Sequence, residues 1–263
     1  MPLLTGIDAS MLGERQSTSN AVARKVPLVH VDANVIDLIE NPPHQIPTYA
    51  TGGKSKNTHR TETLLALGPS AYFYAGRAHP QFGNTALAFA AGCEAGHTGS
   101  ASPFDTGGLL SSPPHLKIRL NPTDGEAERV EFGMASLLPL DDWRGTFCTF
   151  LAAYFESYVH YWQKKPNRHD PEGLVELNED WRAWTFEIRF SQGHEIAERV
   201  AWCADEIMMN ELRRMVDDAP PTIPGDPPSF LDQFLAGPPA LEPAGTILFC
   251  TRLEQWVQEQ VAV

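Results

Sequence analysis

The stretch Arg77–Leu110 gathers side chains that could do chemistry into a short span. It carries His97 and Asp105 together with three hydroxyl residues (Ser100, Ser102, Thr106). Glycine recurs throughout the stretch. Glycine lets the backbone approach a ligand closely, and binding residues often lie on such irregular segments. The stretch therefore predicts a pocket, although it does not identify what the pocket would hold.

A second candidate is the carboxylate of Glu187, which stands in the middle of the segment WRAWTFEIRF at positions 181–190. The segment alternates as a strand does, with aromatic and aliphatic residues on one face and Glu187 and Arg189 on the other. A charge among aromatic residues costs several kcal/mol unless it meets solvent or a partner such as Arg189. Either the polar face is solvated, or Glu187 is held in a cleft to stabilise positive charge, as in an oxocarbenium-like transition state.

Three short segments together resemble the mono-ADP-ribosyltransferases. They are the basic residues that precede a helix in His59-Arg60-Thr61, the pair of serines in Ser100-Ala101-Ser102, and the late strand that carries Glu187. The resemblance implies the fold of that family. It also implies an activity in which NAD is the substrate and its ADP-ribose is transferred to an acceptor. Many free-standing transferases of this kind are toxic, so the resemblance also raises a toxin or a defence effector as the role.

The same resemblance implies a role for each matching residue. His59 or Arg60, with Thr61, would hold NAD, and Glu187 would orient the ribose and stabilise the oxocarbenium ion. The nicotinamide pocket would be shaped by the serines, or by tyrosines if the family's tyrosine variant applies (Ser100, Ser102, Tyr72, Tyr74). Thr185 stands where the arginine-modifying members carry a second acidic residue, so arginine is not the implied acceptor.

Other catalytic patterns are less specific. Cys93 and His97, four residues apart, could be a nucleophile and its base in a hydrolase. No HxH, HExxH or CxxC spacing occurs, so no metal site is predicted. The GGKS run at positions 52–55 is not a phosphate-binding loop, because that motif requires glycine where Thr48 stands.

The main alternative is a protein without enzymatic activity. Residues 1–24 are small and polar and resemble an arm whose order depends on a partner, and residues 219–243 are rich in proline and include PPTIPGDPP. Either segment could bind a protein partner. The chain would then be an interaction subunit of a larger cytoplasmic assembly.

Composition limits the possible functions. The chain has 263 residues, 42% of them hydrophobic, and a formal net charge of −13. A strongly acidic surface disfavours nucleic-acid binding through phosphates. No segment has the length of a membrane span, and the four separated cysteines are expected to be reduced, so a cytoplasmic location is expected.

The hydrophobic pattern predicts an α+β fold with a mixed or antiparallel sheet of short strands packed with two long amphipathic helices. The expected strands are 26–35, 71–76, 98–105, 116–120, 128–132, 181–190 and 246–250. The expected helices are 58–67, 84–94, 143–162, 195–216 and 252–261, of which 143–162 and 195–216 are the two long ones. After the arm at 1–24, residues 25–263 are expected to form a single domain with a proline-rich surface excursion at 217–243.

Overall fold

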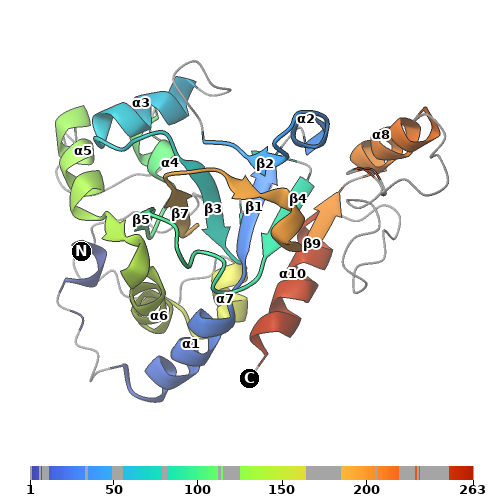
Figure 1. Ribbon diagram of the computed structural model, residues 1–263. Helices are drawn as coiled ribbons and strands as arrows, with labels where there is room; N and C mark the ends of the chain where they lie inside the picture. Colours follow the sequence, from blue (N-terminus) through green and yellow to red (C-terminus); the bar gives the residue numbers. More distant parts are fainter. Residues whose placement is uncertain are drawn as a thin grey trace.

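A computed structural model describes residues 2–5, 7, 12–32, 35–48, 56–78, 82–83, 85–111, 114, 125–163, 185–204, 206–218, 229, 231 and 249–262. These residues form an α+β fold in which helices surround a central antiparallel sheet of short strands (Figure 1). The predicted fold class is therefore confirmed. None of the described helices combines the length and hydropathy needed to cross a bilayer.

The main sheet contains seven strands in the order β6-β5-β7-β3-β1-β4-β9. They are β1 (Leu28–Asp32), β3 (Ala71–Ala75), β4 (Thr85–Phe89), β5 (Gly99–Ser102), β6 (Leu138–Pro139), β7 (Glu187–Phe190) and β9 (Arg199–Ala204). Each neighbouring pair is antiparallel. A separate ribbon pairs β2 (Gln45–Ile46) with β8 (His194–Glu195).

Helices pack around this sheet in three groups (Figure 1). The first group is α3 (Lys56–Leu64), α4 (Thr106–Leu110) and α5 (Glu126–Ala135), which contact one another in that order. The second is α1 (Glu14–Lys25) with α6 (Trp143–Tyr154), followed by the short α7 (Tyr158–Trp162). The third is α10 (Phe249–Val261), which packs on β4, β9 and α1. Two further α-helices among the described residues are α2 (Val35–Glu40) and α8 (Glu206–Asp217).

Helix α1 is fastened to the rest of the fold by polar contacts as well as by packing. Arg144 on α6 donates hydrogen bonds to the carbonyl oxygens of Ala23 (2.6 Å) and Val26 (3.1 Å) at the end of α1. Lys25 donates to the carbonyl oxygen of Ala262 at 2.7 Å. The proposed boundary between an arm at 1–24 and a domain from 25 onward therefore falls inside a helix that packs on α6 and α10.

The aromatic segment 143–162 was predicted as one long helix, and this is wrong. It breaks at Phe155, which is extended (φ −128°, ψ 146°), and a second helix starts after Ser157. The Ser157 hydroxyl accepts a hydrogen bond from the His160 N–H and so caps α7, as serine does at helix starts. The aromatic side chains nevertheless fill the core, where Phe147 and Phe150 surround Phe186.

The second long helix, predicted over 195–216, is also wrong. This segment forms β8, a 3-10 turn (Ile196–Glu198), β9 and then the shorter helix α8. Apolar residues at helical spacing suggested one continuous face, but Ile207, expected to point inward, is 75% exposed. The strand β9 is buried on both faces, so its side chains do not show the alternation by which a strand is recognised.

Two shorter predictions name the wrong type of element: one predicted helix is a strand, and one predicted strand is part of a helix. The alanine-rich segment 84–94 was predicted as a helix, but its described residues form β4 and a series of turns. The strand was not recognised because β4 is buried on both faces of the sheet and its sequence does not alternate. Residues 128–132 were predicted as a strand but belong to α5, whose first turn carries Glu126 and Glu128, favourable at a helix N-terminus. The predicted strand 116–120 and most of 217–243 lie outside the described residues, as do 181–184 and 246–248.

Candidate functional site

Strand β7 lies between β5 and β3, and this order brings most of the candidate residues onto one face of the sheet. Glu187 is in register with Ser102 on one side and Tyr74 on the other. Arg189, two residues further along β7, is in register with Ser100 on β5 and with Tyr72 on β3. Directly opposed residues in antiparallel strands, and residues two apart in one strand, project to the same face. Five of the sequence-predicted residues therefore share a face with Arg189.

Glu187 is fully buried and held by three polar neighbours. One carboxylate oxygen accepts hydrogen bonds from the Thr106 hydroxyl (2.7 Å) and from the Arg189 guanidinium (2.8 Å). The carboxyl group of Asp105 is the third neighbour, and it raises the pKa of Glu187. The interpretation of this strand face as solvated is wrong, since Glu187 is 1% exposed and Arg189 is 0% exposed.

The Asp105–Glu187 contact is a pair of carboxyl groups that can share one proton. Burial raises the pKa of Glu187, the positive charge of Arg189 opposes that rise, and the neighbouring Asp105 adds to it. With one proton on the pair, its single negative charge is balanced by Arg189. Asp105 also accepts a hydrogen bond from the backbone N–H of Gly107 (2.9 Å) and so caps helix α4.

Arg189 on β7 connects its own strand to β5 and to the start of α4. Its side chain donates to the Ser100 hydroxyl at 3.1 Å and to the Thr106 hydroxyl at 3.0 Å, in addition to Glu187. A threonine hydroxyl can accept one hydrogen bond while it donates another, so Thr106 bridges Arg189 and Glu187. Ser100 therefore orients the guanidinium group. Ser102 is occupied differently, because its hydroxyl donates to the carbonyl oxygen of Phe104 at 2.6 Å.

A third buried carboxyl group, Glu62 on α3, extends the polar cluster and was not identified from the sequence. It accepts hydrogen bonds from the Tyr72 hydroxyl (3.1 Å) and from the Ser70 backbone N–H (2.9 Å). Burial raises the pKa of Glu62 and, together with the charge of Glu187, that of Tyr72. Glu62 stands one turn before the buried Leu65, and this inward position was the signal available in the sequence.

The basic residues expected to hold NAD lie at the edge of this cluster. Arg60 donates to the carbonyl oxygen of Leu110 and forms an ion pair with Glu126, so it joins α3 to α4 and α5 and is not brought to Glu187. His59 is exposed on the same helix as Glu62, whose pKa its charge lowers. Thr61 is buried.

The hydrolase alternative receives no support from the structure around Cys93 and His97. The His97 ring stacks on Phe190 with centroids 4.3 Å apart and is hydrogen-bonded to His194 at 3.2 Å. Burial, together with the charge of Glu94, raises the pKa of Cys93 to about 12, so little thiolate forms at neutral pH. Within the described ranges, no group of three or more His, Cys, Asp or Glu residues is placed to hold a metal ion.

The segment that covers the polar cluster is the turn after β5 together with α4. Asp105 and Thr106 come from this segment, and Thr106 is fully buried above Glu187. Glu187 is 1% exposed, so a molecule can reach its carboxylate only after its surroundings rearrange. The segment contains adjacent glycines at positions 107 and 108.

Comparisons with protein-family models, with curated proteins and with solved structures gave no match to this chain. The geometry of the polar cluster and the residue types within it are therefore the guide to function.

Proposed function

We propose that this protein is an NAD-dependent enzyme of the ADP-ribosyltransferase type, with Glu187 as its central carboxylate. The observation that carries the proposal is the register of three strands, which puts Glu187 between Ser102 and Tyr74. These three residues come from separate parts of the chain. The sequence resemblance points to Glu187 together with either the serines or the tyrosines, and Glu187 has one of each beside it.

The chemistry requires stabilisation of a positive charge on a sugar. The bond between the ribose C1′ and the nicotinamide nitrogen breaks, and its electron pair leaves with nicotinamide, which becomes neutral. The lone pair of an acceptor then forms a bond to C1′, and the acceptor loses a proton. The Asp105–Glu187 pair can carry one negative charge toward the ribose and can also take up that proton.

Neighbouring residues would support this carboxyl pair. Arg189 is a positioning residue, since it is bonded to Glu187 and Ser100 and fixes the side chain of Glu187 relative to β5. Tyr74 would line the nicotinamide side, where its ring stacks on Phe82 at 5.3 Å. His59, exposed on α3, is the remaining basic candidate for the NAD phosphates, because Arg60 is engaged with α4 and α5.

Substrate entry requires a rearrangement around Glu187, because this residue is 1% exposed. The ion pair between Glu187 and Arg189 lies within β7 and does not depend on that movement. Opening would therefore expose a carboxylate that remains oriented. This arrangement would also keep water from the site until a substrate is bound.

The test is nicotinamide release from millimolar NAD by the purified protein, compared with the variant Glu187→Gln. Glutamine keeps the shape of the carboxyl group but cannot carry the negative charge of a carboxylate. Nicotinamide release should therefore fall about 100-fold or more. Glu131→Gln, which changes an exposed glutamate on α5, is the matched control and should leave release unchanged. Circular dichroism and urea unfolding would verify that both variants fold.

Two results would contradict the proposal. One is release by wild type that Glu187→Gln does not alter, which would place any NAD chemistry elsewhere. The other is the absence of both NAD binding and nicotinamide release in wild type. The second result would leave the alternative from the sequence, an interaction subunit of a larger assembly, as the function to pursue.

A further inference from the structure

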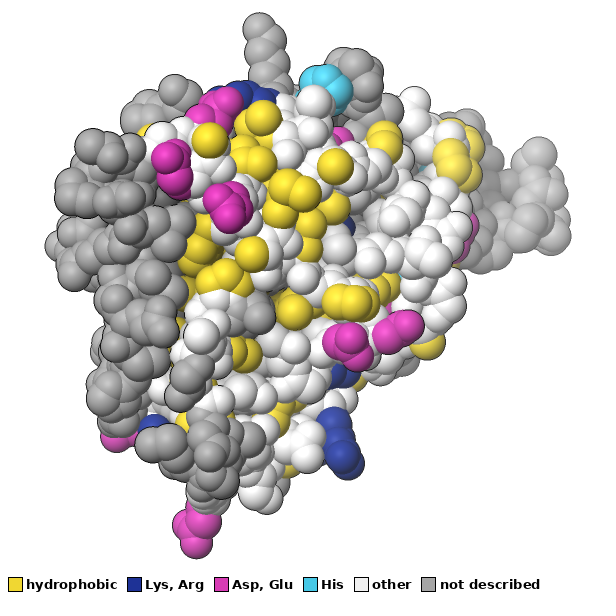
Figure 2. Space-filling view, turned by 90° about the vertical axis from the view of Figure 1, so that its left-hand side faces the viewer, with side chains coloured by type: hydrophobic (Ala, Val, Ile, Leu, Met, Phe, Trp, Pro, Cys, Tyr) yellow, Lys and Arg dark blue, Asp and Glu magenta, His cyan; other side chains and the backbone are white. Residues whose placement is uncertain are grey.

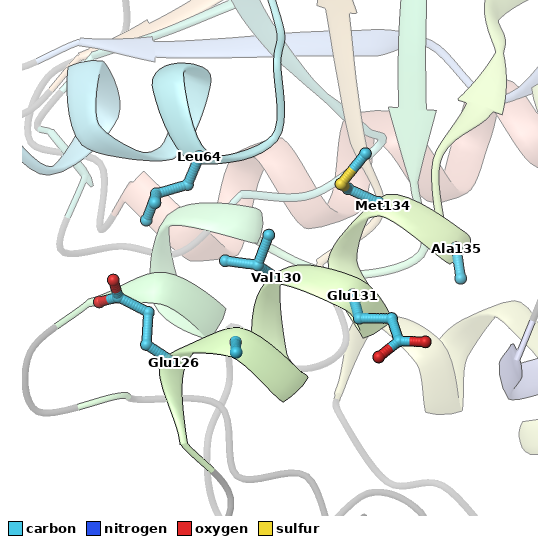
Figure 3. A pocket seen from close by; sticks show the side chains of 7 residues that line it. Leu64, Glu126, Val130, Glu131, Met134 and Ala135 are labelled. Carbon is cyan, nitrogen blue, oxygen red and sulfur yellow. The ribbon is translucent and has the colours of Figure 1, made fainter.

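A shallow groove runs between α3 and α5 on the outside of the fold. Its volume is about 870 Å³, and its lining is mostly apolar (Leu64, Glu126, Ala127, Val130, Glu131, Met134, Ala135). Figure 3 shows Leu64 extending from α3 toward α5, with Glu126 near one end of the lining and Ala135 near the other. The groove is on the α5 side of the molecule, and its lining includes none of the residues bonded to Glu187.

The floor of the groove exposes more apolar surface than the packing of α5 requires. Met134 is 51% exposed, while Phe132 on the opposite side of α5 is buried against Phe104. Ala127, Val130 and Met134 follow one another at helical spacing, so they form a continuous stripe along α5. Figure 2 shows hydrophobic side chains gathered on this side of the molecule with acidic side chains beside them. Exposed apolar stripes with a polar rim are typical of protein-binding surfaces.

The charge at the rim limits which partner fits. The charged residues that line the groove are Glu126, which is paired with Arg60, and Glu131, which is exposed, and the whole chain has a net charge of −13. Nucleic acid would be repelled. A symmetric dimer through this groove would bring each acidic rim close to its own copy, which is unfavourable. A partner with lysine or arginine beside an apolar stripe has the complementary charge.

The length of the groove limits the shape of the partner. Helix α5 has 10 residues, which corresponds to about 15 Å or three turns. An open groove of this length, formed by two helices, matches a third helix that inserts side chains at positions i, i+3 or i+4, and i+7. Methionine adapts to different partner side chains, and this suits it to such surfaces.

We infer that the α3–α5 groove binds a basic amphipathic helix of a partner protein, about three turns long. The apolar stripe of that helix lies on Val130 and Met134, and a lysine or arginine of the helix lies beside Glu131. The inference does not depend on the NAD chemistry proposed above. It holds for an enzyme that is directed to its target and equally for a subunit without activity.

The test is a selection from a displayed library of random three-turn helical peptides. The full-length protein is the target, and Met134→Glu is used for counter-selection. Enriched sequences should combine apolar residues at i, i+3 or i+4, and i+7 with flanking lysine or arginine. Failure to enrich any sequence, or enrichment of acidic or unpatterned peptides, would overturn the inference.

The best peptide is then titrated against variants by fluorescence anisotropy. Met134→Glu should weaken binding at least tenfold, and Glu131→Lys should weaken it several-fold at low salt and less at high salt. Ile207→Glu is the matched control, because Ile207 is an exposed hydrophobic residue on α8, and its replacement should change affinity less than twofold. Equal loss in Met134→Glu and Ile207→Glu would show that the peptide binds exposed hydrophobic residues without regard to the groove.

Discussion

Replacing Arg189 by methionine should reveal how the buried carboxyl pair is balanced. Methionine keeps much of the side-chain volume and removes the guanidinium group, which donates to Ser100, Thr106 and Glu187. The Asp105–Glu187 pair would then hold a negative charge in the core without its cation. Removal of one partner from a buried ion pair typically costs about 3–5 kcal/mol, and we expect a loss of that size at neutral pH.

That loss should depend on pH and on Glu187. The variant can relieve the unbalanced charge by protonating both carboxyl groups, so its deficit relative to wild type should shrink as pH falls toward 5 and grow toward pH 8. Glu187→Gln removes one of the two acids, so in the double variant the cost of Arg189→Met should be smaller by about 1–3 kcal/mol than in wild type.

Glu187→Gln alone should also alter the pH dependence of stability. The pKa of Glu187 is higher in the folded protein than its ordinary value of 4.5, mainly because of burial. Its contribution is therefore fully present below that ordinary value and is lost as pH rises toward the folded pKa. The glutamine variant lacks this titration, so it should gain stability relative to wild type as pH increases from about 4.5 to 8.

Urea unfolding of the four proteins, followed by tryptophan fluorescence at pH 5, 7 and 8, measures these quantities. Arg213→Met is the control, since Arg213 is exposed on α8, and it should change the free energy of unfolding by less than about 0.5 kcal/mol. A cost for Arg189→Met below about 1 kcal/mol, or strictly additive effects in the double variant, would refute the coupled cluster.

Three further predictions follow from contacts outside that cluster. Gly99→Ala should lower the free energy of unfolding by about 2 kcal/mol, measured by urea unfolding, because an added Cβ would overlap a carbonyl oxygen of β7; Gly145→Ala on α6, where the Cβ would meet open space, should not be destabilising. Arg144→Met should lower the free energy of unfolding by about 2 kcal/mol at pH 7 and by less at pH 4, as measured by thermal unfolding. Burial alone would raise the pKa of Glu94, but the hydrogen bond and charge of Arg144 outweigh burial and lower it. The stabilisation by Arg144 is therefore lost as Glu94 is protonated at low pH. Iodoacetamide should label Cys93 about a thousandfold more slowly than a peptide thiol at pH 8, as read by peptide mass spectrometry, and labelling at the peptide rate would contradict the raised pKa of this thiol.

The sequence predicted elements well where a single period was present. Residues 181–190 alternate clearly and residues 71–76 are rich in aromatic residues, and both segments contain strands of the main sheet; the predicted helix 58–67 overlaps α3. The strand β4 was missed because residues buried on both faces remove the alternation, and alanine then favours a helix by propensity. The break at Phe155 depends on the Ser157 cap, which the continuous aromatic pattern obscured.

The candidate site was predictable in its residue types but not in its enclosure. Glu187, Ser100 and Tyr74 could each be named from the sequence, but their strands become neighbours only through pairings between distant parts of the chain. Asp105 and Thr106 were part of the stretch first singled out, without any sign that they would contact Glu187. Glu62 was hidden because a glutamate in a helix is ordinarily solvated.

The strand order of the sheet has a consequence for how this protein folds. Strand β7 lies between β5 and β3, although roughly half of the chain separates its residues from those of β3, and β9 pairs with the equally distant β4. Nearly all of these pairings close long loops, which lowers the rate of folding. Until residues 187–204 join, β5 lacks its inner neighbour and β4 leaves one edge open. Refolding should therefore be slow, and chains interrupted before β7 should expose unpaired strand edges that favour aggregation.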